Sequence, residues 1–123
     1  MPNSDPVVFL VDDDEGARNS LEMLLETYDL EVTSCKSAKQ FLEIVENQGC
    51  ACLVLDIHME GMDGFELLEA LKDHQTSFPV VMITGAMDTG IPEKAKKAGV
   101  LEVLEKPLDV DELVSAIRRT VNK

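Results

Sequence analysis

The sequence VVFLVDDD at residues 7–14 places five apolar residues directly before three aspartates. A second apolar run, Cys52 to Leu55, leads in the same way into Asp56. Short apolar runs predict buried strands, and a carboxylate at the end of such a strand needs a partner. Like charges a few ångströms apart repel by about 1 kcal/mol in water and about 4 kcal/mol near a protein surface. Two such strands in one sheet therefore predict a cluster of acids that requires a cation.

Short apolar runs and amphipathic stretches alternate five times along the chain. The stretches between the runs carry helical spacing and helix-starting residues, such as Ser37 with Gln40, and Pro92 ahead of Gly99. Asp14 is expected to cap the first helix. The expected strands are Val7 to Val11, Glu31 to Ser34, Cys52 to Leu55, Pro79 to Ile83, and Glu102 to Leu104.

The first helix has an apolar stripe at helical spacing. Its members are Ala17, Leu21, Leu24 and Tyr28. Five strand–helix units in strict alternation predict an α/β fold, in which a parallel sheet is covered by helices on both faces. Ligands of such folds bind at the carboxyl ends of the strands. The residues expected to meet there are Asp12, Asp13, Asp56, Thr84 and Lys106.

Composition limits the possible functions. A chain of 123 residues is expected to form one domain. Its formal net charge of −13 argues against direct binding of nucleic acid by this domain. Its first residues show no signal-peptide pattern and no apolar run is long enough for a membrane span, so neither feature is expected. The odd count of cysteines, at Cys35, Cys50 and Cys52, predicts reduced thiols and a cytoplasmic location.

Three carboxylates, a hydroxyl and an ammonium around one crevice suggest a specific chemistry. Oxygen-rich carboxylate sites suit Mg²⁺. A carboxylate nucleophile beside the metal suits phosphoryl transfer to aspartate, with Lys106 and Thr84 holding the remaining oxygens. Taken singly, Thr84 is a common strand-end hydroxyl bonded to backbone, and Lys106 a common solvated loop lysine. Their joint occurrence, one residue for each strand end, carries the prediction.

These residues resemble those of the receiver domains of two-component response regulators, over nearly the whole chain. The resemblance implies a flavodoxin-like, doubly wound (βα)5 fold with strand order 2-1-3-4-5. It further implies a single receiver domain over residues 1–123, with its core at about 7–121. Met59, Gly61, Met62, Asp63 and Gly64 follow the family's loop after the phosphorylated strand.

The resemblance also assigns roles. It makes Asp56 the phosphoacceptor, and it makes Asp13 a direct Mg²⁺ ligand while Asp12 acts largely through water. The backbone carbonyl of His58 would complete the metal ligands. Thr84 matches the switch hydroxyl, and Lys106 precedes Pro107, as in the family, through a bond that is usually cis.

Three positions depart from the family. Glu60 stands where proline is usual, which implies a less rigid loop after Asp56. Gly85 replaces the commoner alanine, which implies easier access for a phosphoryl group. Val103 replaces the aromatic residue that rotates during switching, so no ring movement can occur there. Switching would then proceed through Thr84 and the helix that begins near Pro92.

The resemblance implies a sensor histidine kinase as partner. It allows a homodimer through the face formed by the helix near Pro92, the strand at Glu102 to Leu104 and the last helix. It implies a phosphoacceptor, with only self-phosphorylation and self-dephosphorylation rather than turnover of a substrate. The pattern Ile83-Thr84-Gly85 is most similar to receivers joined to a C-terminal DNA-binding effector domain, so transcription control is expected. A stand-alone receiver and a hybrid-kinase receiver in a phosphorelay are the alternatives.

Two rival classes of function share parts of this pattern: aspartate-nucleophile phosphatases, and binding-only modules of the same fold, which are either flavin-binding modules or pseudo-receivers. Aspartate-nucleophile phosphatases need an acid two residues after the nucleophile, and that position here is His58. Flavin-binding modules of similar fold need a phosphate-binding loop after the first strand. The acidic run from Asp12 to Glu15 would repel phosphate there. The complete acid, Thr84 and Lys106 set also disfavours a binding-only pseudo-receiver.

Overall fold

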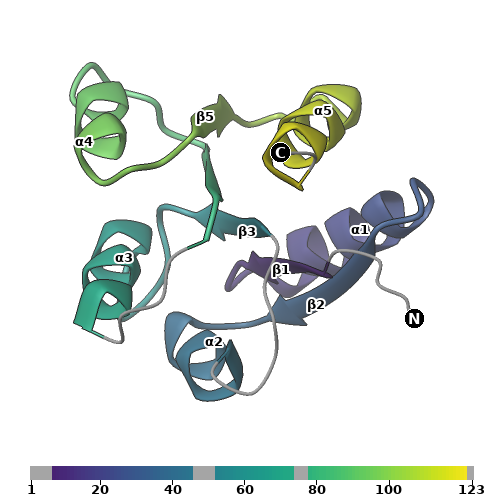
Figure 1. The fold of residues 1–123 in the computed structure, drawn as a ribbon, viewed down its shortest axis with the longest axis horizontal. Helices are drawn as coiled ribbons and strands as arrows, with labels where there is room; N and C mark the ends of the chain where they lie inside the picture. The colour runs from purple at the N-terminus through teal and green to yellow at the C-terminus, as the bar shows by residue number, and fades with distance from the viewer. Residues whose placement is uncertain (1–6, 46–51, 74–77, 122–123) are drawn as a thin grey trace.

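The computed structural model describes residues 7–45, 52–73 and 78–121, where strands and helices alternate as predicted (Figure 1). The strands are β1 (Val7–Val11), β2 (Glu31–Cys35), β3 (Cys52–Asp56), β4 (Val80–Thr84) and β5 (Glu102–Glu105). The helices are α1 (Glu15–Glu26), α2 (Ala38–Val45), α3 (Gly64–Asp73), α4 (Ile91–Lys97) and α5 (Val110–Val121). Every expected strand is confirmed, with ends shifted by one residue at most.

The strands form one parallel sheet in the order β2-β1-β3-β4-β5. The helices α1 and α5 pack on one face, and α2, α3 and α4 pack on the other (Figure 1). This arrangement confirms the doubly wound fold and its strand order. The order changes direction between β1 and β3, so their carboxyl ends mark the expected ligand-binding crevice.

The core consists of two layers, because side chains alternate between the faces of each strand. Val8, Leu10 and Val54 point into the layer under α1 and α5, whereas Phe9 and Leu53 point into the layer under α2 and α3. In that second layer Phe41 lies edge-on to Phe9 at 5.3 Å and to Phe78 at 5.8 Å between ring centroids. Strands buried on both faces fix the sheet that carries the acids.

The apolar face of α1 differs from the prediction at one position. Leu24 is 44% exposed, and its neighbour Leu25 is fully buried beside Leu21. Tyr28 is partly buried against the same core, as expected. Leu24 and Leu25 lie on adjacent faces of the helix, and spacing alone does not fix the helix rotation. The packing of α1 on the sheet and on α5 selects Leu25.

The N-terminal caps of α1 and α2 are formed by the residues that the sequence predicts. Asp14 caps α1, since its Oδ1 accepts hydrogen bonds from the N–H groups of Gly16 and Ala17. Ser37 accepts from the N–H of Gln40, whose own side chain bonds the N–H of Lys36 rather than that of Ser37. The expected capping box is therefore present with its second bond displaced by one residue.

The end of α4 and the state of two cysteines agree with the sequence. Gly99, with a φ of +84°, ends α4 as predicted, because glycine adopts this conformation without strain. Cys35 and Cys52 are buried free thiols, and burial raises the pKa of Cys35 to about 11. Cys50 lies outside the described residues. Within the ranges that the structure describes, no helix is both long enough and apolar enough to cross a bilayer.

Candidate functional site

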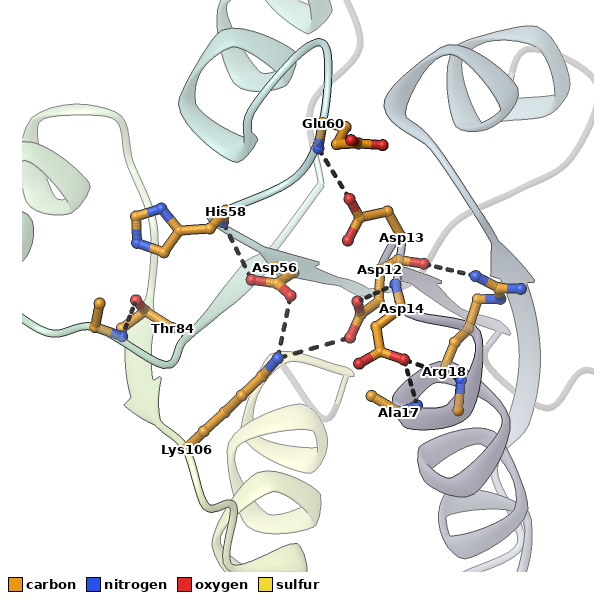
Figure 2. Close-up of polar contacts among 12 residues, drawn as sticks. Asp12, Asp13, Asp14, Ala17, Arg18, Asp56, His58, Glu60, Thr84 and Lys106 are labelled. Carbon is orange, nitrogen blue, oxygen red and sulfur yellow. Dashed lines mark hydrogen bonds and ion pairs between the residues drawn. The ribbon is translucent and has the colours of Figure 1, made fainter.

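The acids predicted to meet at the sheet edge do so (Figure 2). Parallel pairing of β1 with β3 sets Val11 opposite Leu55, so the residues that follow them lie side by side. Asp12, Asp13 and Asp56 each offer a carboxylate oxygen, and these oxygens lie within 4.8 Å of one another. Three negative groups at that separation require positive charge close by.

Lys106 supplies part of that charge from the end of β5, on the far side of β4. Its Nζ lies 3.2 Å from Oδ2 of Asp56 and 3.9 Å from Oδ2 of Asp12 (Figure 2). The backbone N–H of Lys106 donates to the carbonyl of Thr84 at 2.8 Å, which continues the sheet pairing beyond the strand. The bond from Lys106 to Pro107 is cis, as expected. The sheet thus delivers a lysine from one strand end to the acids of two others.

Each carboxylate is also held by a backbone N–H. Asp12 Oδ1 accepts from Asp14 N–H at 2.9 Å, and Asp56 Oδ1 accepts from His58 N–H at 3.1 Å. Asp13 Oδ2 accepts from the N–H of Glu60 at 2.9 Å. These bonds fix the direction of each carboxylate. The acids are therefore oriented before any ligand binds.

The three acids differ in how far they are exposed to solvent. Asp12 is 3% exposed and Asp56 is 5% exposed, whereas Asp13 is exposed. Burial raises the pKa of Asp12, and the charge of Asp56 raises it further, against the lowering effect of the Asp14 N–H and Lys106. Partial burial lowers the pKa of Lys106, but its bond to Asp56 and the charges of the acids prevail and raise it. Lys106 therefore stays charged as the counter-ion of the cluster.

Thr84 ends β4 and is fully buried. Its Oγ1 accepts a hydrogen bond from the N–H of Ala86 at 3.0 Å (Figure 2). The hydroxyl therefore holds its own loop, as is common for a strand-end threonine. The structure places Thr84 at the same edge as the acids, but engaged with backbone.

The sequence did not predict the contact that Arg18 makes at the site or the close packing of Gly64 against β3. Arg18 on α1 donates from Nη1 to the backbone carbonyl of Asp12 at 2.8 Å and ties the acidic loop to the helix (Figure 2). Gly64 begins α3 so close to β3 that a Cβ would lie 2.9 Å from the carbonyl oxygen of Asp56. Helical spacing from the acids is a weak signal for Arg18. A glycine at a helix start is a weak signal for close packing.

The donor set fits a hard divalent cation. Carboxylate oxygens from two loops converge, and three acids face the single charge of Lys106, which leaves an excess of negative charge. Mg²⁺ prefers such oxygen ligands and commonly takes one or two carboxylates. His58 contacts the cluster through its backbone N–H. The role of its carbonyl as a ligand stays a prediction.

The family model described as "Response regulator receiver domain" matches residues 8–118. The chain belongs to the receiver domain family of response regulators. The family match, with the fold, confirms the resemblance seen in the sequence and favours a receiver over the phosphatase and flavin-binding alternatives. Receiver domains pair with histidine kinases and generally bind Mg²⁺ at an acidic pocket, and in this chain Asp12, Asp13 and Asp56 form an acidic cluster.

Two relatives are named Transcriptional regulatory protein FixJ. The protein from Bradyrhizobium diazoefficiens is 34% identical over 116 residues, which cover 94% of this chain and 57% of FixJ. The Azorhizobium caulinodans protein is 37% identical over 123 residues, covering 100% of this chain and 58% of FixJ. The receiver thus spans less than two thirds of either relative.

Two solved structures are similar in fold. FixJ-N matches with a TM-score of 0.89 and 34% identity, over 98% of this chain and 96% of that one. The response regulator StyR matches with a TM-score of 0.87 and 39% identity, over 97% of this chain and 60% of StyR. Both similarities extend over nearly all of the receiver.

Replacing Lys106 by methionine should destabilise the metal-free receiver. The change leaves Asp12 and Asp56 buried without their counter-ion. We expect the free energy of unfolding to fall by about 1–2 kcal/mol, a reduced value because the Lys106 side chain is 35% exposed. The loss should be smaller in MgCl₂, since a bound cation replaces the missing charge. Urea unfolding with and without MgCl₂ measures both effects.

Lys72→Met is the matched control. Lys72 pairs with Glu69 at 3.2 Å on the exposed surface of α3, so its loss should change stability by less than about 0.5 kcal/mol. Equal effects of the two substitutions, in metal-free buffer, would show that Lys106 does not offset the repulsion among the acids.

Proposed function

We propose that Asp56 accepts a phosphoryl group from a phosphohistidine of a sensor histidine kinase. The observation that carries this proposal is the setting of the Asp56 carboxylate. It is 5% exposed, one oxygen accepts the His58 N–H, and the other contacts Lys106 at 3.2 Å. A buried carboxylate held between an N–H and a lysine, beside two further acids, is directed and ready to act as a nucleophile.

The transfer forms one bond and breaks one. A carboxylate oxygen of Asp56 attacks phosphorus, while the phosphorus–nitrogen bond of the phosphohistidine breaks and its electron pair stays on the departing imidazole. The product is an acyl phosphate, which carries a charge of about −1.5 to −2 at neutral pH in place of the single negative charge of the carboxylate. Lys106 is in contact with Asp56 and is positioned to follow the new phosphoryl oxygens.

Mg²⁺, when bound, would neutralise charge on the transferring group. Asp13 would hold it directly together with Asp56 and the backbone carbonyl of His58, and Asp12 would act largely through water. The convergence of Asp12, Asp13 and Asp56 supports this ligand set. The set completes the same site that presents Asp56 to the kinase.

Thr84 would carry the signal away from Asp56. Its hydroxyl would leave the Ala86 N–H and turn to the phosphoryl group, which would shift the loop that leads from β4 to α4. Val103 is partly buried in the same core layer as Ile91 of α4. Because valine has no ring to rotate, the shift would pass through Thr84 and the start of α4.

The output would be transcription, through a C-terminal effector domain, in the cytoplasm. Support comes from the FixJ relatives, which are named as transcriptional regulatory proteins and are longer than this chain. The face formed by α4, β5 and α5 would join two copies. It presents the exposed Leu101 and an ion pair between Arg119 and Glu102. The domain would catalyse its own phosphorylation and dephosphorylation but would turn over no separate substrate.

Replacing Asp56 by asparagine should abolish labelling by radioactive acetyl phosphate in MgCl₂. The amide cannot form an acyl phosphate, so the expected loss is complete. Incorporation of label into purified protein measures it. Asp29→Asn is the control, because Asp29 is exposed and its φ of 64° suits asparagine. Undiminished labelling of Asp56→Asn would remove Asp56 as the acceptor.

Replacing Asp13 by alanine should abolish stabilisation by Mg²⁺. A ligand present at a hundred times its dissociation constant stabilises a folded protein by about 2.7 kcal/mol. We expect Mg²⁺ at that concentration to stabilise the unaltered protein by this amount and the variant not at all. Thermal unfolding across a MgCl₂ titration, together with calorimetric titration, measures the effect. Glu15→Ala removes an exposed acid next to the cluster and should leave the titration unchanged. An unchanged curve for Asp13→Ala would show that the ligand set is misplaced.

A further inference from the structure

The carboxylate of Asp13 is held differently from those of its neighbours. Asp12 and Asp56 each accept from an N–H two residues further along their own loop. Asp13 accepts instead from the backbone N–H of Glu60, 47 residues away in the loop that follows β3 (Figure 2). This bond joins the two loops that carry the acids. The direction of the Asp13 carboxylate therefore depends on residue 60 having an N–H.

Of the three acids, Asp13 depends most on a hydrogen bond to fix the direction of its carboxylate. Asp12 and Asp56 are buried, and packing limits their rotamers. Asp13 is exposed, so an unheld side chain would sample several rotamers, and a bound cation would have to select one. A carboxylate has two oxygens with about four lone-pair positions, so a bond to Oδ2 leaves Oδ1 able to face the cluster.

We infer that the main-chain N–H of Glu60 is a positioning group that fixes Asp13 for cation binding. This inference rests on the proposed Mg²⁺ site. The receiver family usually has proline at this position, and proline has no N–H to donate. The departure at Glu60 therefore adds a hydrogen bond to a metal ligand, besides its expected effect on loop rigidity. Groups that orient metal ligands typically change metal affinity by about 10–100-fold.

The side chain of Glu60 offers a competing explanation. Glu60 is exposed and lines an open acidic depression with Asp13, Asp63 and Glu66. Its carboxylate would attract a cation through its field, without any contact. That attraction is screened by salt, with a Debye length of about 8 Å at physiological ionic strength. A hydrogen bond from the main chain to Asp13 is much less sensitive to salt. The two contributions are therefore separable.

The decisive pair of variants is Glu60→Pro and Glu60→Ala. Proline removes both the N–H and the carboxylate, whereas alanine removes the carboxylate and keeps the N–H. Calorimetric titration with MgCl₂ at low and high salt should show Mg²⁺ affinity about tenfold weaker in Glu60→Pro at both. Glu60→Ala should lose affinity only at low salt and match the unaltered protein at high salt. Urea unfolding in metal-free buffer establishes that each variant is folded.

A second measurement leaves residue 60 intact. In metal-free protein, hydrogen exchange of the Glu60 amide should be faster in Asp13→Ala than in the unaltered chain, because its acceptor is gone. Equal exchange rates would overturn the inference, as would equal high-salt affinities of Glu60→Pro and Glu60→Ala. Mg²⁺ that fails to bind the unaltered protein would instead overturn the proposed function. The two failures are therefore distinct.

Discussion

Repulsion among acids at one edge of a parallel sheet is the constraint on which this site depends. The hydrophobic strands β1 and β3 bring Asp12 and Asp56 together, and the chain offsets the cost with Lys106 from β5. One lysine against three acids leaves a deficit of positive charge. A divalent cation would supply the missing positive charge, and it would leave Lys106 able to contact the oxygens of a phosphoryl group.

Much of the fold could be predicted because its signals are local. Apolar runs of strand length mark the sheet, and Asp14 and Gly99 mark helix ends. The rotation of α1 about its axis could not be predicted, because Leu24 and Leu25 are both apolar and only packing on the sheet distinguishes them. Regular alternation is sufficient for the order of elements, whereas burial at a single position is a tertiary property.

The candidate site also has a part that the sequence predicts and a part that it does not. Strand-end positions predicted which side chains meet, because parallel strands end at one edge. The hydrogen bonds that orient them were not predictable, since those bonds come from the backbone: Glu60 N–H to Asp13, and His58 N–H to Asp56. The bond from Arg18 to the Asp12 carbonyl depends on how α1 leaves the acidic loop. The side chains specify the chemistry, while the main chain specifies its geometry.

The most direct test of phosphoryl transfer to this acid cluster is to locate the modified residue. The receiver is phosphorylated with acetyl phosphate in MgCl₂ and reduced with borohydride, which converts an aspartyl phosphate to homoserine. Its peptides are then sequenced by mass spectrometry. Homoserine at position 56 alone is the expected result. Homoserine at position 12 or 13, or a phosphorylated protein with no homoserine at 56, would contradict the assignment of Asp56 as the phosphoacceptor.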